Sequence, residues 1–458
     1  MRITLGIPLT IAEIARATGG TAPMNENEIV HAISTDTRTL EEKDLFWAIK
    51  GASFDGADYI SAALATGCHV LSARKSATIR VKDTTEALSS LASYYKRLLN
   101  NLQYTVAITG SVGKTTTKEF LKEILSVKYK VHATEGNYNN TIGMPLTILS
   151  APFDTEILIL EMGMNSIGEI SKLSQCAEPN LGIITNIGTS HIGMLGSRER
   201  IAAAKLELLD GMTGGAVAVP YGEKLLENIK NKITFSIDRA DADVCIEIEE
   251  NGLISVRMKD HCINAVPFGI KGNHFLECLG AALAVSKETI TEREAVKIGI
   301  SRISNNNIRQ KLINIGDFRI LDDSYNASYE SIISDFNLLS SMCGNEPKSI
   351  LIGTVLELGA YSYDIHYKIG LAAASHGFRR LFFFGEFADA MATGALDGGY
   401  DPDKIFVNSN LDAPDLTAAE IIRGRVSGET ILFKASNRVR LSRVVELIKK
   451  QLTEGENG

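Results

Sequence analysis

The sequence lacks the features that mark secreted, membrane-spanning and nucleic-acid-binding proteins. No apolar run approaches the ~20 residues that cross a bilayer, and Met1–Pro8 is too short and too polar at its ends for a signal peptide. The 6 cysteines show no C-x-x-C spacing, which excludes a disulfide framework or a zinc site as the organising feature. The net charge of −8 gives no basic field to attract nucleic acid. We therefore expect a cytoplasmic protein without membrane insertion or a nucleic-acid partner, and we expect it to act as a monomer.

Length and composition describe an ordinary globular chain of more than one domain. The chain has 458 residues, of which 45% are hydrophobic and 22% charged. A single hydrophobic core rarely extends over that length, so two or three domains are expected.

The first region, residues 1–103, mixes short helices and strands. Residues 9–18 predict a helix that Gly19 and Gly20 end, and residues 84–99 predict an amphipathic helix that begins at a Thr84 cap. Strands are predicted over 45–49 and 69–71. We predict that this region forms the N-terminal domain.

The second region, residues 104–308, alternates buried strands with helices. The runs 157–160 and 181–184 are apolar on both faces, as parallel strands covered by helices on both sides must be. Residues 233–260 alternate polar and apolar side chains and predict an antiparallel appendage. This pattern predicts a central domain with a parallel sheet.

The third region, residues 309–458, starts a second α/β series and predicts a doubly wound, Rossmann-like domain. Its predicted strands are 318–321, 349–352, 381–384, 405–407 and 430–433. No G-x-G-x-x-G follows its first strand, so a dinucleotide site is not supported.

The most informative stretch runs from Val106 to Thr117. An apolar strand is followed by a turn of small residues and then by a helix that begins near Lys114. Such a turn exposes backbone N–H groups and the positive helix N-terminus to a phosphate. Lys114 would reach the β- and γ-phosphates, and the Thr115 hydroxyl would bind Mg²⁺. The predicted phosphate-binding residues are Gly110, Ser111, Val112, Gly113, Lys114, Thr115 and Thr116.

This motif is a short form of the phosphate-binding loop. Only Gly-x-x-Gly-Lys-Thr is present, because Ile108 stands five residues before Gly113. A chance glycine–serine turn before a helix is the alternative.

Three polar side chains of the central region follow predicted strands or lie on a helix nearby. Glu161 ends the strand 157–160, where a carboxylate can bind Mg²⁺ or simply face solvent. His191 lies beyond the end of the next strand, and the sequence leaves open whether it binds a ligand. Lys205 falls on the alanine-rich face of a helix capped by Ser197. Burial there would require compensation for its charge, unless the side chain extends to the surface.

Two further segments carry polar groups that would face a ligand. The glycine loop 136–145 contains Asn137, Asn139 and Asn140, which would orient an acyl or phosphate group or form a plain turn. In the third region, Arg309 precedes the first strand and residues 322–326 follow it, at the edge where a cleft against the central domain is expected.

In this order along nearly the whole chain, these motifs resemble the Mur ligases, the ATP-dependent amide ligases of peptidoglycan assembly. The segments that carry the resemblance are 109–117, 136–146, 161–170, 186–205, 322–327 and 357–366, with 34–38 and 51–56 near the N-terminus. The resemblance implies three α/β domains: a small UDP-sugar-binding domain, a P-loop ATPase domain and a Rossmann-like domain. It also implies an acid–amino-acid ligase that uses ATP and Mg²⁺.

The substrates implied by the resemblance are UDP-N-acetylmuramoyl-tripeptide and D-alanyl-D-alanine, joined through an acyl phosphate. The UDP-sugar side would be bound by Ser34, Asp36, Thr37, Arg38, Phe54, Asp55 and Gly56. Asn137, Asn139, Asn140, Tyr325 and Asn326 would contact the substrates, and His274, Arg309 and Asp323 the nucleotide. The implied catalytic set is Lys114, Glu161, His191 and Lys205, of which Thr115, Glu161, His191 and a carbamylated Lys205 would hold Mg²⁺. Carbamylation would turn the Lys205 cation into an anion.

The chain departs from the family pattern in three places. Phe275 and Cys278 stand where asparagine is common, and Ser328-Tyr329 replaces Asn-Pro. Lys434-Ala435-Ser436-Asn437 replaces Lys-Gly-Ser-Arg, and asparagine cannot clamp a carboxylate as a guanidinium does. Arg438 or Arg440 would take over that role, or the amine acceptor differs. Two alternatives therefore stay open: a Mur-type ligase with another acceptor, and a non-catalytic nucleotide-binding paralogue.

Overall fold

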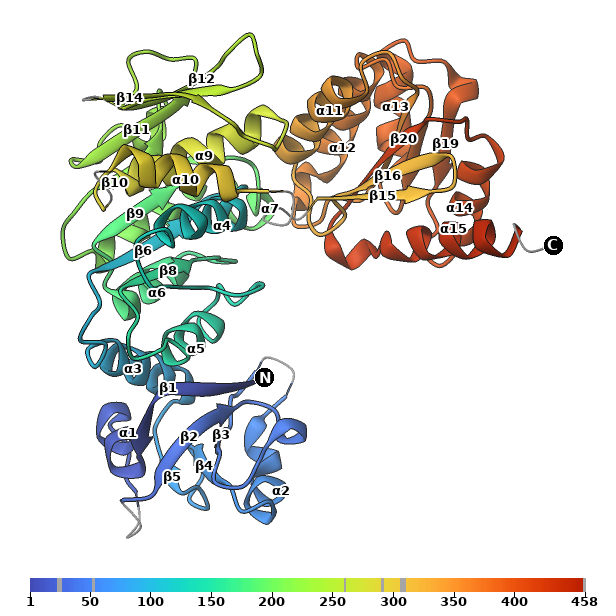
Figure 1. The fold of residues 1–458 in the computed structure, drawn as a ribbon. Coiled ribbons are helices and arrows are strands. Elements are labelled where there is room, and N and C mark those ends of the chain that lie inside the picture. The colour runs from blue at the N-terminus through green and yellow to red at the C-terminus, as the bar shows by residue number, and fades with distance from the viewer. Residues whose placement is uncertain (23–26, 52–53, 259–260, 290–291, 305–309, 456–458) are drawn as a thin grey trace.

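The computed structural model describes residues 1–22, 27–51, 54–258, 261–289, 292–304 and 310–455, and these form three α/β parts with one sheet each (Figure 1). The predicted fold class is confirmed. The boundaries after residues 103 and 308 stay predictions. Among the described residues, no helix is long and apolar enough to cross a membrane.

The N-terminal part is built on a five-stranded sheet in the order β1-β2-β3-β4-β5. β1 runs antiparallel to β2, and the other pairs are parallel. The strands are β1 (Arg2–Thr10), β2 (Ile29–Ser34), β3 (Leu45–Trp47), β4 (His69–Ser72) and β5 (Ile79–Arg80). The helices are α1 (Ile11–Thr18), α2 (Ile60–Ala65) and α3 (Thr84–Lys96).

Both predicted helices of this part are shorter than expected. Residues 9 and 10 belong to β1. The Thr10 side chain accepts a hydrogen bond from the Glu13 N–H and caps α1, so the helix begins at Ile11. The predicted glycine stop is confirmed, since Gly19 adopts a left-handed conformation at the C-cap. Helix α3 is capped by Asp83 rather than Thr84 and ends at Lys96 rather than Leu99.

The central part is built on a nine-stranded sheet in the order β14-β13-β12-β11-β10-β9-β6-β8-β7. Its strands are β6 (Tyr104–Thr109), β7 (Val131–Ala133), β8 (Ile157–Glu161), β9 (Leu181–Ile184), β10 (Val217–Pro220), β11 (Lys232–Ile237), β12 (Val244–Ile248), β13 (Ile254–Met258) and β14 (His261–Val266). Its helices are α4 (Lys114–Leu125), α5 (Gly143–Leu149), α6 (Glu169–Ala177), α7 (Ile192–Leu195), α8 (Arg198–Leu206), α9 (Asn273–Ser286) and α10 (Arg293–Arg302).

The predicted antiparallel appendage is an extension of this central sheet. β11 pairs in parallel with both β10 and β12, and only β12–β14 pair antiparallel. The residues alternate because one face of these strands is covered while the other is open, whereas β6, β8 and β9 are buried on both faces.

The C-terminal part is built on a six-stranded sheet in the order β15-β16-β20-β17-β18-β19. Only β15 is antiparallel to its neighbour. The strands are β15 (Lys311–Ile315), β16 (Phe318–Asp322), β17 (Lys348–Gly353), β18 (Leu381–Phe384), β19 (Ile405–Asn408) and β20 (Thr430–Lys434). The helices are α11 (Tyr329–Cys343), α12 (Ser362–Ala374), α13 (Ala388–Asp397), α14 (Pro414–Arg423) and α15 (Ser442–Gly455).

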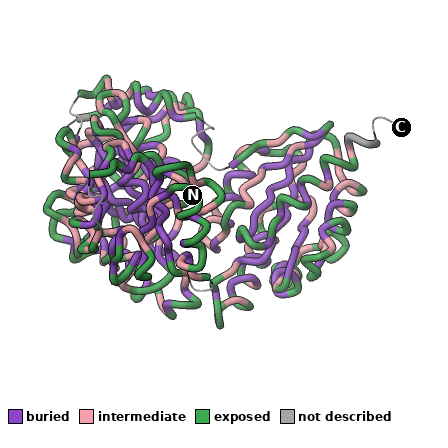
Figure 2. The backbone as a smooth tube through the Cα atoms, turned by 90° about the horizontal axis from the view of Figure 1, so that it is seen from below, coloured by how far each residue is buried: buried purple, intermediate pink, exposed green. Residues whose placement is uncertain are grey.

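This sheet is covered on both faces, as predicted for a doubly wound domain. Ile350 and Ile352 of β17 belong to one hydrophobic cluster, and Leu351 between them belongs to another. Figure 2 shows the buried strands lying between more exposed helices.

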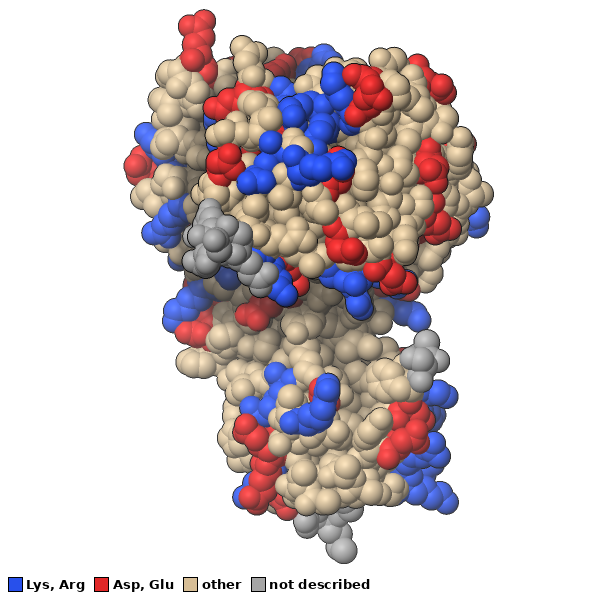
Figure 3. Space-filling model, turned by 90° about the vertical axis from the view of Figure 1, so that its right-hand side faces the viewer, with Lys and Arg blue, Asp and Glu red and all other residues tan. Residues whose placement is uncertain are grey.

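On the face drawn in Figure 3, basic and acidic side chains form small neighbouring groups. β16 and β20 are parallel neighbours. Asp323, which follows β16, and Lys434, the last residue of β20, therefore lie at the same edge of the sheet.

The N-terminal part is joined to the central part through α3. Tyr95 of α3 is fully buried, and its hydroxyl accepts a hydrogen bond from the Ile7 N–H (2.6 Å) and donates one to the Ala151 carbonyl (2.8 Å). The Lys96 ammonium donates to the Ala177 and Glu178 carbonyls at the end of α6. These bonds connect β1, α3 and the central helices in one hydrogen-bonded junction.

We expect Tyr95→Phe to lower the free energy of unfolding by about 1–3 kcal/mol, because it leaves a buried N–H and a buried carbonyl unpaired. Chemical denaturation measures this change. The neighbouring Tyr94→Phe is the matched control, and equal effects of the two substitutions would contradict the role given to the Tyr95 hydroxyl.

Candidate active site

The phosphate-binding loop has the predicted strand–turn–helix form. β6 ends at Thr109, and α4 begins at Lys114 after a turn in which Gly110 and Gly113 have φ values of 151° and 82°. A Cβ on Gly110 would lie 1.8 Å from the Thr185 hydroxyl oxygen. Glycine is therefore required at Gly110 by both conformation and space.

Two residues that follow β9 brace this loop. The Thr185 hydroxyl donates to the Val112 carbonyl at 2.6 Å. The Asn186 side-chain oxygen accepts from the backbone N–H groups of Ser111 (3.1 Å) and Val112 (3.0 Å). The sequence did not single out this role, although the position of β9 beside β6 in the sheet explains it.

Glu161 lies where a magnesium ligand was expected. It ends β8 with 2% of its surface exposed, and its carboxylate accepts hydrogen bonds from the Thr115 hydroxyl (2.7 Å) and the Asn139 amide (2.8 Å). A carboxylate and a hydroxyl oxygen at a helix N-terminus fit Mg²⁺, which takes one or two protein carboxylates and completes its shell with phosphates and water. Consistent with so sparse a donor set, no group of three or more His, Cys, Asp or Glu side chains arranged to hold a metal occurs in the described part of the chain.

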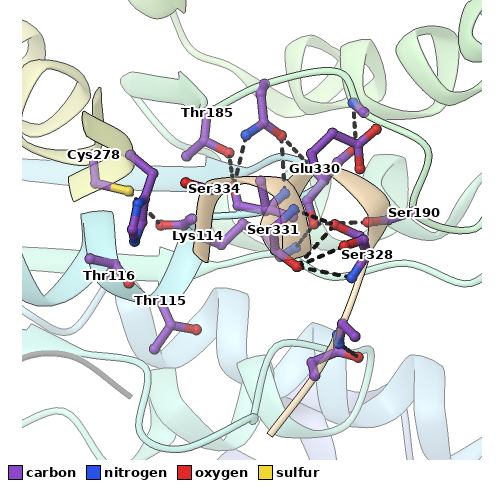
Figure 4. A pocket seen from close by; sticks show the side chains of 18 of the residues that line it. Lys114, Thr115, Thr116, Thr185, Ser190, Cys278, Ser328, Glu330, Ser331 and Ser334 are labelled. Carbon is purple, nitrogen blue, oxygen red and sulfur yellow. Dashed lines mark hydrogen bonds between the residues drawn. The ribbon is translucent and has the colours of Figure 1, made fainter. Parts of the chain in front are cut away.

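A cavity of about 560 Å³ lies between the central part and the C-terminal part. Its lining from the central part comes from the phosphate-binding loop, the loop 137–139, the end of β8, the segment 185–190 and the start of α9. The C-terminal part contributes the residue after β16, the end of β20 and the first turns of α11. Figure 4 shows Ser328 and Glu330 toward the same side of the view as Ser190, with Lys114, Thr115 and Thr116 toward the other side.

The cavity brings together most of the predicted nucleotide and acyl-side residues. Those that line it are Ser111, Val112, Gly113, Lys114, Thr115, Thr116, Asn137, Asn139, Glu161, His274, Asp323, Tyr325 and Asn326. Gly110 lies against Thr185 and outside the lining. Asn140 instead accepts hydrogen bonds from the N–H groups of Ile142 and Gly143 at the start of α5. Arg309 is outside the described residues.

His191 and Lys205 do not line the cavity. His191 Nδ1 lies 2.7 Å from the Glu357 carboxylate of the C-terminal part. The hydrogen bond with His191 holds the pKa of Glu357 below its ordinary value. Lys205 is 2% exposed and is paired with no carboxylate within the described ranges. Burial, reinforced by the positive charge of Lys114, lowers the pKa of Lys205 well below its ordinary value.

The predicted UDP-sugar residues all lie in the N-terminal part and outside the cavity lining. Asp36 and Asp55 cap short turns by accepting from the N–H groups of Arg38 and Ala57. The Ser34 hydroxyl is buried and donates to the backbone, while Phe54 is 57% exposed. The remaining residues of this set are Thr37 and Gly56, in the 3₁₀ turns Thr37–Thr39 and Gly56–Tyr59.

Several side chains that the sequence did not assign belong to the cavity. Glu330 of α11 accepts from the Thr189 N–H (2.7 Å) and hydroxyl (3.1 Å), so it connects the C-terminal part to the loop after β9. Lys434, at the end of β20, forms ion pairs with Asp323 and Asp335. No local pattern signals these contacts, because each joins residues at least 99 positions apart in the chain.

The structure also places the residues that depart from the family pattern. Ser328 caps α11, which begins at Tyr329. Ala435 is fully buried, and the Ser436 hydroxyl accepts from the Leu356 N–H. Arg438 lies close enough to Glu357 to contribute to the lowering of its pKa.

His366 has a structural role. Its Nε2 accepts from the Val355 N–H at 2.9 Å, so Nδ1 carries the proton and donates to the Ser362 carbonyl at 2.6 Å. The side chain is fully buried, and burial lowers its pKa.

Comparison with known proteins agrees with this geometry. Residues 108–286 match the model of the Mur ligase middle domain, and residues 29–79 match that of the Mur ligase family catalytic domain. A protein of Bacillus subtilis (strain 168), named UDP-N-acetylmuramoyl-tripeptide--D-alanyl-D-alanine ligase, is 34% identical over 98% of this chain and 100% of its own length.

Two solved structures have the same fold over nearly the full chain. MurF from Acinetobacter baumannii has a TM-score of 0.86 with 26% identity and covers 98% of this chain and 100% of its own. MurF ligase from Thermotoga maritima in complex with ADP has a TM-score of 0.79 with 27% identity and covers 92% of this chain and 98% of its own. The chain belongs to the Mur ligase family.

We expect Gly110→Ala to weaken binding of a nucleoside triphosphate at least tenfold, or about 1.4 kcal/mol. The added methyl group would displace Thr185 and with it the hydrogen bond to the loop. Isothermal titration calorimetry measures the affinity. Gly269→Ala is the control, because a Cβ there meets nothing within 4 Å. Unchanged affinity of Gly110→Ala would contradict the assignment of the loop.

Proposed function

We propose that this chain is an ATP-dependent amide ligase that adds D-alanyl-D-alanine to UDP-N-acetylmuramoyl-tripeptide through an acyl phosphate, in peptidoglycan precursor synthesis. The observation that carries the proposal is the Glu161 carboxylate against the Thr115 hydroxyl at the N-terminus of α4, inside a cavity that the C-terminal part also lines. The full-length relative from Bacillus subtilis, which is named for this reaction, supports the choice of substrates.

The phosphate-binding loop holds the triphosphate of ATP. The N-terminus of α4 would face the phosphates, and Lys114, which donates to the Gly110 carbonyl at 2.7 Å, would turn toward the γ-phosphate. Mg²⁺ held by Thr115 and Glu161 would neutralise charge that develops on the phosphates. Asn137 and Asn139 would orient the substrate carboxylate that attacks the γ-phosphate, and Tyr325 and Asn326 would position the incoming amine.

The C-terminal part would help to shield the acyl phosphate from water. Glu330 and the His191–Glu357 contact connect the C-terminal part to the loop after β9, which also braces the phosphate-binding loop. Exclusion of water favours attack by the amine over hydrolysis.

Lys205 is suited to carbamylation. A lowered pKa leaves a neutral amine, which is the form that adds to carbon dioxide. The resulting anion would remove the cost of a buried, unpaired cation and, with His191, would hold or orient a second Mg²⁺. The proximity of Lys114 favours a negative charge at this position.

The same proposal covers the remaining assignments. Residues 1–103 would bind the UDP-sugar, 104–308 ATP, and 309–458 the nucleotide and amine from the other side. The chain would act as a monomer. The 6 cysteines are free, which supports a reducing, cytoplasmic location.

The first test is phosphate release from ATP and Mg²⁺ with UDP-N-acetylmuramoyl-tripeptide, with and without D-alanyl-D-alanine. We expect release only when both substrates are present, a pentapeptide product by mass spectrometry, and no turnover in Lys114→Ala. A panel of other amines tests the first alternative, since stimulation by another amine alone would identify a different acceptor. Background turnover with every acceptor would support the non-catalytic paralogue.

The second test concerns Lys205. With ¹³C-bicarbonate, we expect a carbamate carbon signal in the NMR spectrum of the native chain that is absent from Lys205→Met and retained in the exposed control Lys172→Met. Removal of carbon dioxide should lower activity reversibly. An identical spectrum for native protein and Lys205→Met would contradict carbamylation.

A further inference from the structure

Lys434 is the centre of a buried charge cluster at the edge of the cavity. Its ammonium, whose side chain is 3% exposed, pairs with Asp323 and lies 2.8 Å from Asp335 Oδ2. The Gln310 amide donates to the other Asp335 oxygen at 2.7 Å. Four separate elements therefore meet here: β20, the residue after β16, α11 and the segment before β15.

The cluster carries two carboxylates and one ammonium, so it has one excess negative charge when both carboxylates are ionised. Burial raises the pKa of Asp323 to about 6; Lys434 opposes the rise, and Asp335 adds to it. Burial alone would lower the pKa of Lys434, but the two carboxylates outweigh it and raise that pKa. The state of Asp323 near neutral pH thus depends on its two charged neighbours.

The position of the cluster relative to the phosphate-binding loop indicates which part of a nucleotide it faces. The Cys278 sulfur lies beside Gly113 of the loop, 3.7 Å from its carbonyl oxygen. His274 is four residues earlier on α9, about 6 Å along the helix axis, and lies within electrostatic reach of Lys434 and Asp323. The cluster is therefore about one helical turn beyond the phosphate end of the cavity, where the nucleoside begins.

The chemistry of the cluster favours sugar hydroxyls as its ligand. A carboxylate repels phosphates but accepts hydrogen bonds from hydroxyl groups. Lys434 is engaged by both carboxylates and is almost fully buried, so it is not placed to contact a phosphate itself. Asp323 lines the cavity and retains 16% side-chain exposure.

We propose that Lys434 is a positioning residue that keeps Asp323 ionised and directed into the cavity as the acceptor for the ribose hydroxyls of the nucleotide, while Asp335 and Gln310 hold Lys434 in place. This inference rests on the proposed function only in taking a ribonucleotide as the ligand of the cavity. Lys434 acts through Asp323 and does not touch the substrate.

The proposal makes nucleotide affinity dependent on pH. Ionised Asp323 accepts the hydroxyl protons, so affinity should be full above a pH of about 6 and fall as the pH drops through that value. His274 on α9 also faces the cluster, but burial and the charge of Lys434 lower its pKa to about 4, so it stays neutral over this range. Among the described residues, the other charged groups that act on Asp323 are Lys434 and Asp335.

The test compares binding of ATP with binding of 2′,3′-dideoxy-ATP by calorimetry, without the other substrates. We expect the native chain to favour ATP about tenfold and Lys434→Met to lose most of this preference. The exposed control Lys368→Met should match the native chain. An unchanged preference in folded Lys434→Met, or no preference in the native chain, would overturn the proposal.

The pH dependence supplies a second, independent readout. Loss of the cation should move the midpoint for ATP binding to higher pH in Lys434→Met, and loss of a like charge should move it to lower pH in Asp335→Asn. A merely structural role predicts weaker binding without these opposite shifts, and shifts in the same direction would contradict the proposal. If Lys434→Met does not fold, Asp335→Asn alone decides by the direction of its shift. Because only binding is measured, a failed ligase assay would leave this result unaffected.

Discussion

The close approach of Thr185 to Gly110 is the constraint on which the site depends. β6 and β9 are parallel neighbours, so the residues that follow them meet at one edge of the sheet. Only a glycine allows the Thr185 side chain to reach the turn and bond the Val112 carbonyl. The protein's own contacts thus hold the turn in its shape, which reduces the entropy cost of forming a phosphate site.

The same loop after β9 contacts both the C-terminal part and the phosphate-binding loop. Thr185 and Asn186 brace the turn, while Thr189 and His191, a few residues on, contact Glu330 and Glu357 of the C-terminal part. The N-terminal part is attached differently, through the buried hydroxyl of Tyr95 and the Lys96 ammonium. A shift of the C-terminal part would therefore change the contacts of the loop that braces the turn before Lys114.

The sequence predicts those parts of the fold and of the candidate site that depend on residues close together in the chain. Glycine spacing, apolar runs and caps act over a few residues, so the turn before Lys114, the buried strands and the glycine stop at Gly19 were predicted correctly. Strand β1 and the continuity of β11–β14 with the central sheet were missed, because pairing depends on partners far along the chain. The Lys434 cluster was missed for the same reason, since Asp323 and Lys434 are brought together only by the pairing of β16 with β20. The UDP-sugar set came from family resemblance alone, and the structure places it in the N-terminal part without testing its role.

The central claim is that the substrate carboxylate attacks ATP to form an acyl phosphate in this cavity. The most direct measurement uses UDP-N-acetylmuramoyl-tripeptide labelled with ¹⁸O in the reacting carboxylate and follows the label in the phosphate released during amide formation. The account predicts that one ¹⁸O atom is transferred to each phosphate, because the oxygen that attacks the γ-phosphate leaves with it. Amide formation with unlabelled phosphate would contradict the account.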